Sequence, residues 1–271
     1  DKKIDRNFKI KSHPNYPIDW SVSTIKRIVV KGGILYAYGD FNYRSFGVET
    51  ISNIIAINSI TGNLIPFPKL RGSGDMINVG DKLVFSASSL NTLKDSVGKV
   101  FNGLAVIDMN SLTVSEVNVN PSVPDFFAYG PLVESNGKLV VRFQHNLTAQ
   151  AKLAVFDSMS VVPKWQIDLN NQNFTGHLTA DNTTIYILIQ DTSQGTSDFL
   201  IQALDITTGQ PKSGWNIQNF RFKSTQNSSQ AYPTSISISN ARLFISGLFD
   251  KVNLQSITNA AMIDLGTNTL I

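Results

Sequence analysis

A short pattern of apolar residues, followed by Asp or Asn and then a turn, recurs five times along the 271-residue chain. Its copies end at Asn58, Asp108, Asp157, Asp205 and Asp264, so that successive copies lie 50, 49, 48 and 59 residues apart. A regular period of this length is typical of repeat architectures, in which each copy is one supersecondary unit. The short Asp and Asn side chains suit the place because they accept hydrogen bonds from backbone N–H groups of the turn that follows.

Each copy of this pattern is preceded by a second apolar segment, such as Lys82–Phe85 or Lys138–Val141. Tight-turn pairs, including Gly32-Gly33 and Asn136-Gly137, come before most of these segments and predict hairpins. Because the segments are almost continuously apolar, we expect central strands that are buried on both faces. Two further strands complete each unit: inner strands at 24–30, 75–79, 132–134, 177–180 and 235–239, and outer strands at 64–70, 114–119, 165–169 and 215–218.

Four short strands per unit and no sustained 3.6-residue period predict an all-β fold, a five-bladed β-propeller. We expect one domain over 1–271, with blades at 24–74, 75–130, 131–176, 177–230, and 231–271 together with 1–12. The last unit stops at Ile271, where its outer strand is expected to begin, and the segment Ile4–Ile10 reads as a strand without a partner of its own. That segment is expected to join the last blade and close the ring. The competing interpretation is a piece of a larger propeller.

Composition excludes several classes of protein and of site. The chain has no cysteine, so disulfides, thiolate metal sites and cysteine nucleophiles are absent. The net charge of +3 is mild, and the only basic cluster, within residues 2–11, reads as a solvated end and predicts no nucleic-acid partner. No apolar run reaches the length of a membrane span. The chain begins with Asp1, which we interpret as a processed form or an excised segment of an exported protein.

The first and last units carry the fullest version of the repeat. The first reads Gly39-Asp40-Phe41 and then 53–58, and the last reads Gly247-Leu248-Phe249 and then 258–264. This Gly-x-Phe…Asn-x-x-Ala-x-Ile-Asp pattern resembles the delta-60-type repeats of bacterial secreted and surface proteins, and shares general features with quinoprotein-like propellers. The middle units lack the Gly-x-Phe element. The resemblance implies extracellular display, adhesion or ligand binding, although a fold does not determine a function.

Aromatic residues are the strongest indication of a binding site. In a propeller, the loops that join outer to inner strands emerge on one face, and here they are rich in rings. Flat rings beside amides and charges suit sugars or protein side chains, because a ring face stacks while polar edges donate hydrogen bonds. The predicted ligand-binding residues are Tyr43, Arg44, Phe126, Phe127, Tyr129 and Tyr232.

Three functions are consistent with these observations. The first is an extracellular adhesin or lectin-like recognition module, a monomeric domain of a larger surface chain whose partner is a glycan or a surface protein. The second is a glycoside hydrolase or lyase that uses acids at the channel mouth, for which Asp75, Glu134 and Asp181 are the candidates. The third is a scaffold. The three histidines show no metal-ligand spacing, so no metal, cofactor or catalytic residue is predicted.

Overall fold

The computed structural model describes residues 18–45, 48–72, 74–87, 92–117, 126–145, 148, 150–157, 160, 162–169, 173–191, 198–216, 220–224 and 232–271. For 18–24, 40–45, 48–52, 173–175 and 232 it describes the backbone alone. The chain divides into two compact units, Asp1–Leu132 and Val133–Ile271. All regular secondary structure in the described residues is β-strand, which confirms the predicted all-β class. Within that part of the chain, no helix has the length and apolarity needed to cross a membrane.

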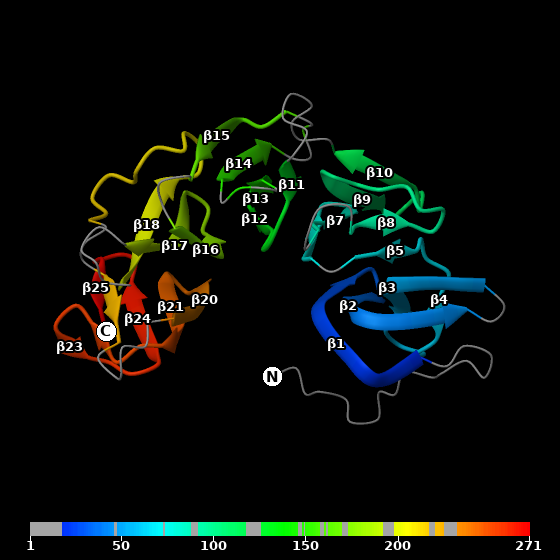
Figure 1. The fold of residues 1–271 in the computed structure, drawn as a ribbon, viewed down its shortest axis with the longest axis horizontal. Helices are drawn as coiled ribbons and strands as arrows, with labels where there is room; N and C mark the ends of the chain where they lie inside the picture. The colour runs from blue at the N-terminus through cyan, green and yellow to red at the C-terminus, as the bar shows by residue number, and fades with distance from the viewer. Residues whose placement is uncertain are drawn as a thin grey trace. The chain divides into compact units, whose positions relative to one another are not determined.

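The first unit contains two antiparallel four-stranded sheets (Figure 1). One sheet runs β1 (Ile18–Lys31), β2 (Ile34–Ser45), β3 (Val48–Asn58) and β4 (Leu64–Ile65) in sequence order. The other runs β6 (Met76–Val79), β7 (Lys82–Phe85), β9 (Leu104–Asp108) and β10 (Val114–Val117). The short strands β5 (Leu70–Arg71) and β8 (Lys94–Asp95) pair with each other, and β11 (Phe126–Ala128) is the last strand of the unit.

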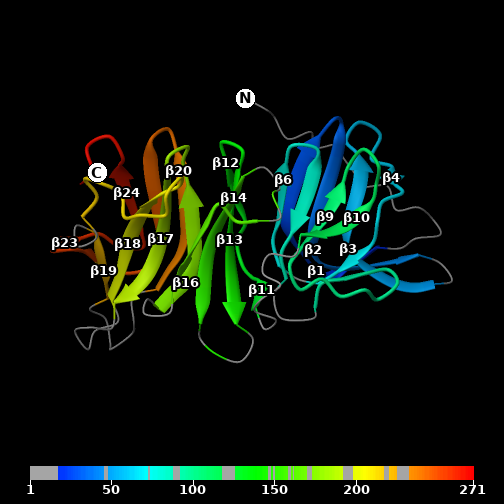
Figure 2. The ribbon, with the colours of Figure 1, turned by 90° about the horizontal axis from the view of Figure 1, so that it is seen from above.

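The second unit contains three sheets of the same design, which stand side by side in Figure 2. The strands of the first are β12 (Val133–Ser135), β13 (Lys138–His145), β14 (Ala151–Asp157) and β15 (Trp165–Asp168). The next has β16 (Asn173–Ala180), β17 (Thr184–Asp191), β18 (Asp198–Asp205) and β19 (Arg221–Lys223), extended by β22 (Lys251–Val252) and β23 (Gln255–Ser256). The last has β20 (Tyr232–Ser239), β21 (Arg242–Leu248), β24 (Ala260–Asp264) and β25 (Thr269–Leu270).

The predicted hairpins form where the sequence places tight-turn pairs. Gly32 and Gly33 join β1 to β2 with φ of 57° and 75°, and Asn136 and Gly137 join β12 to β13 with φ of 51° and 72°. Two consecutive positive φ values match the right-handed twist of the flanking strands, and Gly and Asn adopt them at the lowest cost. These turns set the register of each inner strand against the central strand of its sheet.

In four of the five repeats, the Asp or Asn after the third strand caps a turn, as the sequence predicts. Asn58 Oδ1 accepts hydrogen bonds from the backbone N–H groups of Ile60 (3.0 Å) and Thr61 (2.9 Å). Asp108, Asp205 and Asp264 make the same pair of bonds to the residues two and three positions further on. Asp157 forms ion pairs with Lys138 (3.0 Å) and Lys164 (3.4 Å), and the residue two positions further on lies outside the described part of the chain. The recurring Asp or Asn therefore ends its strand, because its side chain accepts hydrogen bonds from the turn that follows.

Sheets within a unit pack face to face, and β17 shows this most clearly. Its alternate residues Ile185, Ile187 and Ile189 join a core cluster with the sheet of β13 and β14. Tyr186 and Leu188, which point the other way, join a cluster with the last sheet. Each of these five side chains is at most 6% exposed, so the strand is buried on both faces. This confirms the expectation for a central strand between two neighbouring sheets.

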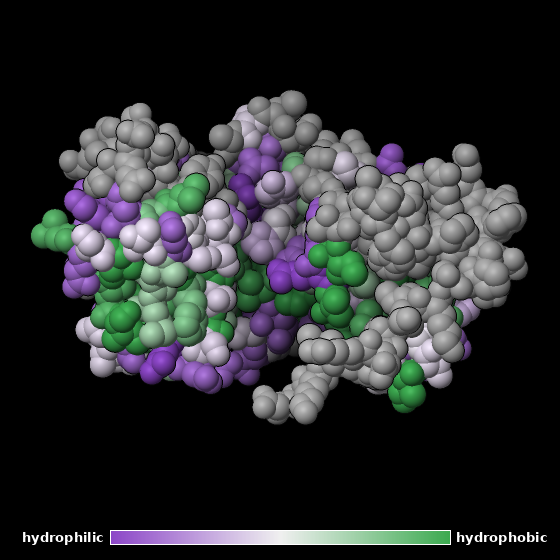
Figure 3. Space-filling model, turned by 90° about the horizontal axis from the view of Figure 1, so that it is seen from below, coloured by the Kyte–Doolittle hydropathy of each residue, from purple (hydrophilic) through white to green (hydrophobic). Residues whose placement is uncertain are grey.

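The first and last sheets of the chain each expose apolar side chains on one face, although Ala37, Ile55 and Ile57 on that face of the first sheet are buried. In β1, Val29 packs into the core of the first unit, whereas Ile28 and Val30 are 55% and 64% exposed. In the last sheet, Leu243 and Ile245 are buried and Phe244 between them is 39% exposed. Figure 3 shows apolar surface on this part of the second unit. The first sheet of the first unit and the last sheet of the second unit therefore both expose apolar side chains.

The outer strands of the last two sheets differ from those predicted. An outer strand was expected at 215–218, but Trp215 and Asn216 are not in a strand, and β19 takes the fourth place by pairing with β18. The Trp215 side chain packs against Tyr186 and Phe220 and donates from Nε1 to the carbonyl of Ile201 (2.8 Å), so its ring fills the space beside β18. The last sheet already has a short outer strand, β25. The closing segment 4–10 lies outside the described residues, as does His13.

The turn aspartates make stability depend on pH. Hydrogen bonds from the Ser111 and Thr267 backbones lower the pKa of Asp108 and Asp264. At Asp205, partial burial acts in the opposite direction, but the N–H groups of Thr208 and Thr207 outweigh it and lower the pKa. A lowered folded-state pKa adds stability that is complete above the unfolded value of about 4 and is lost as pH falls through the folded value.

We expect the melting temperature of the protein to fall more steeply below about pH 4 than that of the triple variant Asp108→Asn/Asp205→Asn/Asp264→Asn. At neutral pH the two proteins should melt at similar temperatures, because Asn58 shows that an amide caps the same turn. Thermal unfolding followed by circular dichroism between about pH 2.5 and 7 tests this window. Parallel curves for the two proteins would contradict it.

Candidate functional site

The aromatic residues predicted to bind ligand fall in different places. Phe127 is 5% exposed and belongs to the core of the first unit. Its ring packs edge-on against Tyr129 at a centroid distance of 5.8 Å. Tyr129 is partly exposed and lines a pocket. Phe126 is partly buried in β11, and the side chains of Tyr43, Arg44 and Tyr232 lie outside the described residues. Of the three predicted residues whose side chains are described, Tyr129 is the one that lines this pocket.

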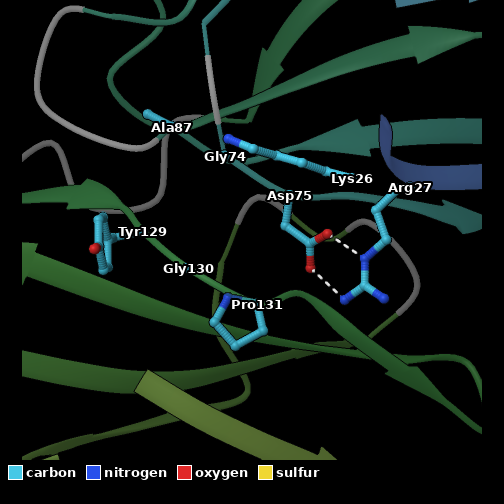
Figure 4. Close-up of a pocket in the computed structure, with 8 residues that line it drawn as sticks. All are labelled: Lys26, Arg27, Gly74, Asp75, Ala87, Tyr129, Gly130 and Pro131. Carbon is cyan, nitrogen blue, oxygen red and sulfur yellow. Dashed lines mark hydrogen bonds and ion pairs between the residues drawn. The ribbon is translucent and has the colours of Figure 1, made fainter. Parts of the chain in front are cut away.

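This pocket of about 390 Å³ lies within the first unit, between the second half of β1 and the chain that leads into β6 (Figure 4). Its volume falls within the range of small-molecule sites, roughly 300–1,000 Å³. Inner strand β1 contributes two cationic residues, and the chain just before β6 contributes a carboxylate. The segment after β11 contributes the aromatic wall. The lining residues are Lys26, Arg27, Gly74, Asp75, Ala87, Tyr129, Gly130 and Pro131.

The Asp75 carboxylate holds the pocket together. Its Oδ1 accepts hydrogen bonds from Arg27 Nε (2.5 Å) and from the Met76 backbone (2.9 Å). Its Oδ2 accepts from Arg27 Nη2 (3.0 Å) and from the Leu132 backbone (2.9 Å). A carboxylate has about four lone-pair positions, so these four bonds use its accepting capacity. Asp75 is only 7% exposed, and it therefore acts as a buried anchor for the arginine and for the two chain segments.

Close backbone packing fixes the segment that carries Asp75. The Asp75 N–H donates to Ser86 Oγ (3.0 Å), and that hydroxyl donates to the carbonyl of Gly130 (2.9 Å). A side chain at Gly74 would place its Cβ 2.0 Å from the Ser86 carbonyl oxygen, so only glycine fits there. The segment that carries Asp75 is therefore packed directly against the backbone around Ser86.

The Arg27 guanidinium is held in place and stays charged. Hydrogen bonding to Asp75 raises its pKa, burial acts against this, and the charge of Asp75 raises it further. The bidentate geometry orients the planar group, yet half of the side chain is exposed. An arginine held in this way presents its remaining N–H groups without a large loss of side-chain entropy on binding.

Glu134 and Asp181, the other two acids predicted as catalytic candidates, accept hydrogen bonds from turns in the second unit. Glu134 on β12 accepts a hydrogen bond from the Gly137 backbone (2.9 Å) in the hairpin to β13. Asp181 accepts from the backbone N–H groups of Thr183 and Thr184 (2.8 Å each) between β16 and β17. Both are therefore explained by local backbone structure.

No group of three or more His, Cys, Asp or Glu residues that could hold a metal ion lies within the described ranges. His177, on β16, is half-buried, and burial together with the charge of Arg142 lowers its pKa. In the same unit, Arg221 bridges Asp191 and Asp198 at 2.9 Å each, which ties the ends of β17 and β18 to β19. Arg221 and its two aspartates therefore link neighbouring strands of one sheet.

Sequence reasoning missed Lys26 and Arg27. Arg27 and Asp75 are 48 residues apart, and each looks like an ordinary charged residue in its own segment. The repeat pattern offered one indication: Arg27 and Asp75 belong to the predicted inner strands of adjacent repeats, and a propeller brings such strands side by side.

The sequence matches no known family model and no curated protein. The structure resembles the β-propeller domain of the Trilobed protease from Pyrococcus furiosus with a TM-score of 0.52 and 11% identity, covering 92% of this chain and 70% of that one. Weaker matches include a quinohemoprotein alcohol dehydrogenase from Pseudomonas putida HK5 (TM-score 0.48, 12% identity, 90% and 40% coverage) and the Dos1 propeller (0.47, 12%, 88% and 72%). The chain therefore has a β-propeller fold. Since identity is low, this likeness concerns the fold alone.

We expect Arg27→Gln to lower the free energy of unfolding by about 2 kcal/mol, because it leaves the buried Asp75 carboxylate unpaired while half of the lost guanidinium faced solvent. Asp75→Asn should also destabilise the protein. In the double variant the two costs should fall short of additivity by about 1 kcal/mol or more. Urea unfolding of all four proteins measures this coupling.

The matched control is the pair Lys152 and Asp168, which lie 3.4 Å apart with Asp168 largely exposed. The cycle of Lys152→Gln and Asp168→Asn should show a much smaller coupling. Full additivity at Arg27 and Asp75 would contradict the role given to Asp75 as an anchor.

Proposed function

We propose that the protein is an extracellular recognition module, an adhesin or lectin-like domain of a larger bacterial surface chain, which binds a glycan or protein ligand through one face of the propeller. The observation that carries this proposal is the pocket of the first unit, whose lining combines an aromatic ring, two cations and a carboxylate with no accepting capacity left. Such a lining binds and orients a ligand, because it offers a stacking surface and hydrogen-bond donors.

The lining does not suit acid–base hydrolysis at Asp75. A glycosidase of the usual type needs one carboxylic acid to protonate the leaving group and a second carboxylate as nucleophile or base. Both oxygens of Asp75 already accept two hydrogen bonds each, two of the four from the Arg27 guanidinium, so no lone pair is left to take up a proton or to attack a sugar carbon. Recognition is therefore the function that the pocket favours over hydrolysis.

A glycan array and pull-downs with bacterial and host cell envelopes test this proposal. We expect binding to at least one envelope component, and about a tenfold loss of affinity in Tyr129→Ala, because the ring is the stacking surface of the pocket. Phe244→Ala, which removes a partly exposed ring on β21 of the second unit, is the matched control and should bind normally. Absence of binding to any component, or glycan cleavage that Asp75→Asn abolishes, would refute the proposal.

For the architecture, we propose that the sheets form a five-bladed ring closed by the segment Ile4–Ile10, which would add to β25 in the last sheet. Two observations, one in each unit, support closure. The first sheet exposes Ile28 and Val30, and the last sheet exposes Phe244 and Ile271, which is 56% exposed. A sheet that leaves such side chains in water has not completed its packing, and a short edge strand such as β25 has backbone groups available for pairing.

Deleting residues 1–12 should then lower the melting temperature by several degrees, because it removes the closing strand. Hydrogen exchange at the amides of β25 and Ile271 should become faster in the truncated protein, while exchange in β17, which is buried between sheets, should change little. Unchanged exchange at β25 after the deletion would refute closure by this segment.

A further inference from the structure

Two peptide bonds of the chain join Asn to Gly, and in both the asparagine is exposed. Asn102-Gly103 lies just before β9, and Asn136-Gly137 forms the hairpin turn between β12 and β13. In such a pair the glycine nitrogen, which has no neighbouring side chain in its way, can attack the side-chain carbonyl carbon of the asparagine. Each pair is therefore a place where the chain can modify itself.

The reaction is deamidation, and it needs water as its only co-reactant. The glycine nitrogen loses its proton and forms a bond to Cγ of the asparagine. The bond from Cγ to Nδ2 then breaks, and ammonia leaves with the proton. Water opens the resulting cyclic imide at either of its carbonyl groups, so that the product is aspartate or isoaspartate, in which the backbone runs through the former side chain.

In the first pair, a glutamate from a neighbouring strand holds the attacking nitrogen. Glu116 Oε1, on β10, accepts hydrogen bonds from the N–H groups of Gly103 (3.1 Å) and Asn102 (2.9 Å). The Asn102 carbonyl accepts a further hydrogen bond from the Ala128 backbone (3.4 Å). The peptide group that joins Asn102 to Gly103 is therefore held on both sides, by residues that the pairing of β9 with β10 and the position of β11 bring to it.

The second pair is held in the same way by a different glutamate. The Gly137 N–H donates to Oε1 of Glu134 (2.9 Å), three residues earlier on β12. Ser135 and Lys138 pair on either side of the turn, and Asn136 has a φ of 51°. The cyclic imide requires the glycine nitrogen to turn toward the asparagine side chain, and strand pairing on both sides of a two-residue turn resists that rotation.

We propose that Asn102 and Asn136 are latent deamidation sites and that Glu116 and Glu134 keep them unreacted. A carboxylate that accepts the N–H hydrogen bond favours retention of the proton, and its negative charge disfavours the anionic nitrogen that attacks. A hydrogen bond to a charged group also has to be broken before the attack, which corresponds to about tenfold in rate. This protection is independent of the proposed recognition function, because it needs neither a ligand nor a partner.

Reaction at Asn136 would damage the hairpin in which it lies. Isoaspartate adds a carbon atom to the backbone, and the length of this turn sets the register of β12 against β13. The new carboxylate would also place a second negative charge in the turn that already contains Glu134. A deamidated chain should therefore have a less stable β12–β13 hairpin, and the protecting glutamate preserves the sheet as well as the asparagine.

Peptide mapping by mass spectrometry, after storage of the folded protein in neutral buffer, tests the proposal. Asn136 should deamidate at least about tenfold faster in Glu134→Ala than in the parent protein, and Asn102 should do so in Glu116→Ala. Each variant is the matched control for the other, because the pair whose glutamate is intact should react at the parent rate. Glu134→Gln and Glu116→Gln, which retain a neutral acceptor, should give intermediate rates.

Two further measurements separate loss of the hydrogen bond from loss of the fold. The variants at Glu134, an exposed residue, should melt within a few degrees of the parent protein. In concentrated urea, where the turns are unfolded, parent and variants should deamidate at equal rates at each site. Glu116 is half-buried, and if Glu116→Ala is unfolded in buffer, the rate in Glu116→Gln decides for Asn102.

Three outcomes would refute the proposal. Equal rates in the folded parent and the folded alanine variants would show that the glutamates do not protect. Slower reaction in the alanine variants would show that the carboxylate assists the attack as a base. Faster reaction at both sites in a single variant would show a general loosening of the chain in place of a local effect.

Discussion

Burial of one sheet against the next is the interaction on which the rest of the structure depends. An isolated four-stranded sheet here would leave an apolar face in water, since β17 alone presents Ile185, Ile187 and Ile189 on one side and Tyr186 and Leu188 on the other. Fully burying each such side chain contributes about 1.5–3 kcal/mol. This makes each repeat dependent on its neighbours, and it explains why exposed apolar side chains are found in the first and last sheets, which each lack one neighbour within their unit.

The pocket follows from the same stacking. Adjacent inner strands lie close together because their sheets pack face to face, and this brings the Arg27 side chain of one repeat to the Asp75 carboxylate of the next. Asp75 also accepts from the Leu132 backbone, so a single carboxylate joins three chain segments. A charged group this deeply buried is costly unless all its acceptor positions are filled, and here they are. The site is thus an ion pair between adjacent repeats, Arg27 with Asp75, and Lys26 and Tyr129 line the pocket beside it.

Much of the fold was predictable because its signals are local. Asn58 and the aspartates that match it lie two and three residues from the N–H groups that they cap, and the Asn136-Gly137 hairpin needs only its own two residues. The outer strand expected at 215–218 does not form at Trp215 and Asn216, and the reason is non-local. The Trp215 ring packs against Tyr186 and Phe220, and β19 pairs with β18 instead. Of the candidate site, Tyr129 was predicted from the pattern of aromatic loops, whereas Lys26 and Arg27 were not.

The sequence by itself therefore determined the repeat, most of the inner and central strands, the turns and the all-β class, since spacing, alternation and turn chemistry act over a few residues. The tertiary structure alone decided which side chains meet across repeats: that Asp75 accepts four hydrogen bonds, that Phe127 is core while Tyr129 lines a pocket, and that Lys26 and Arg27 share this lining with Asp75. The physical reason is distance along the chain. A contact between residues 48 positions apart leaves no trace in the local pattern, because it depends on how whole sheets stack.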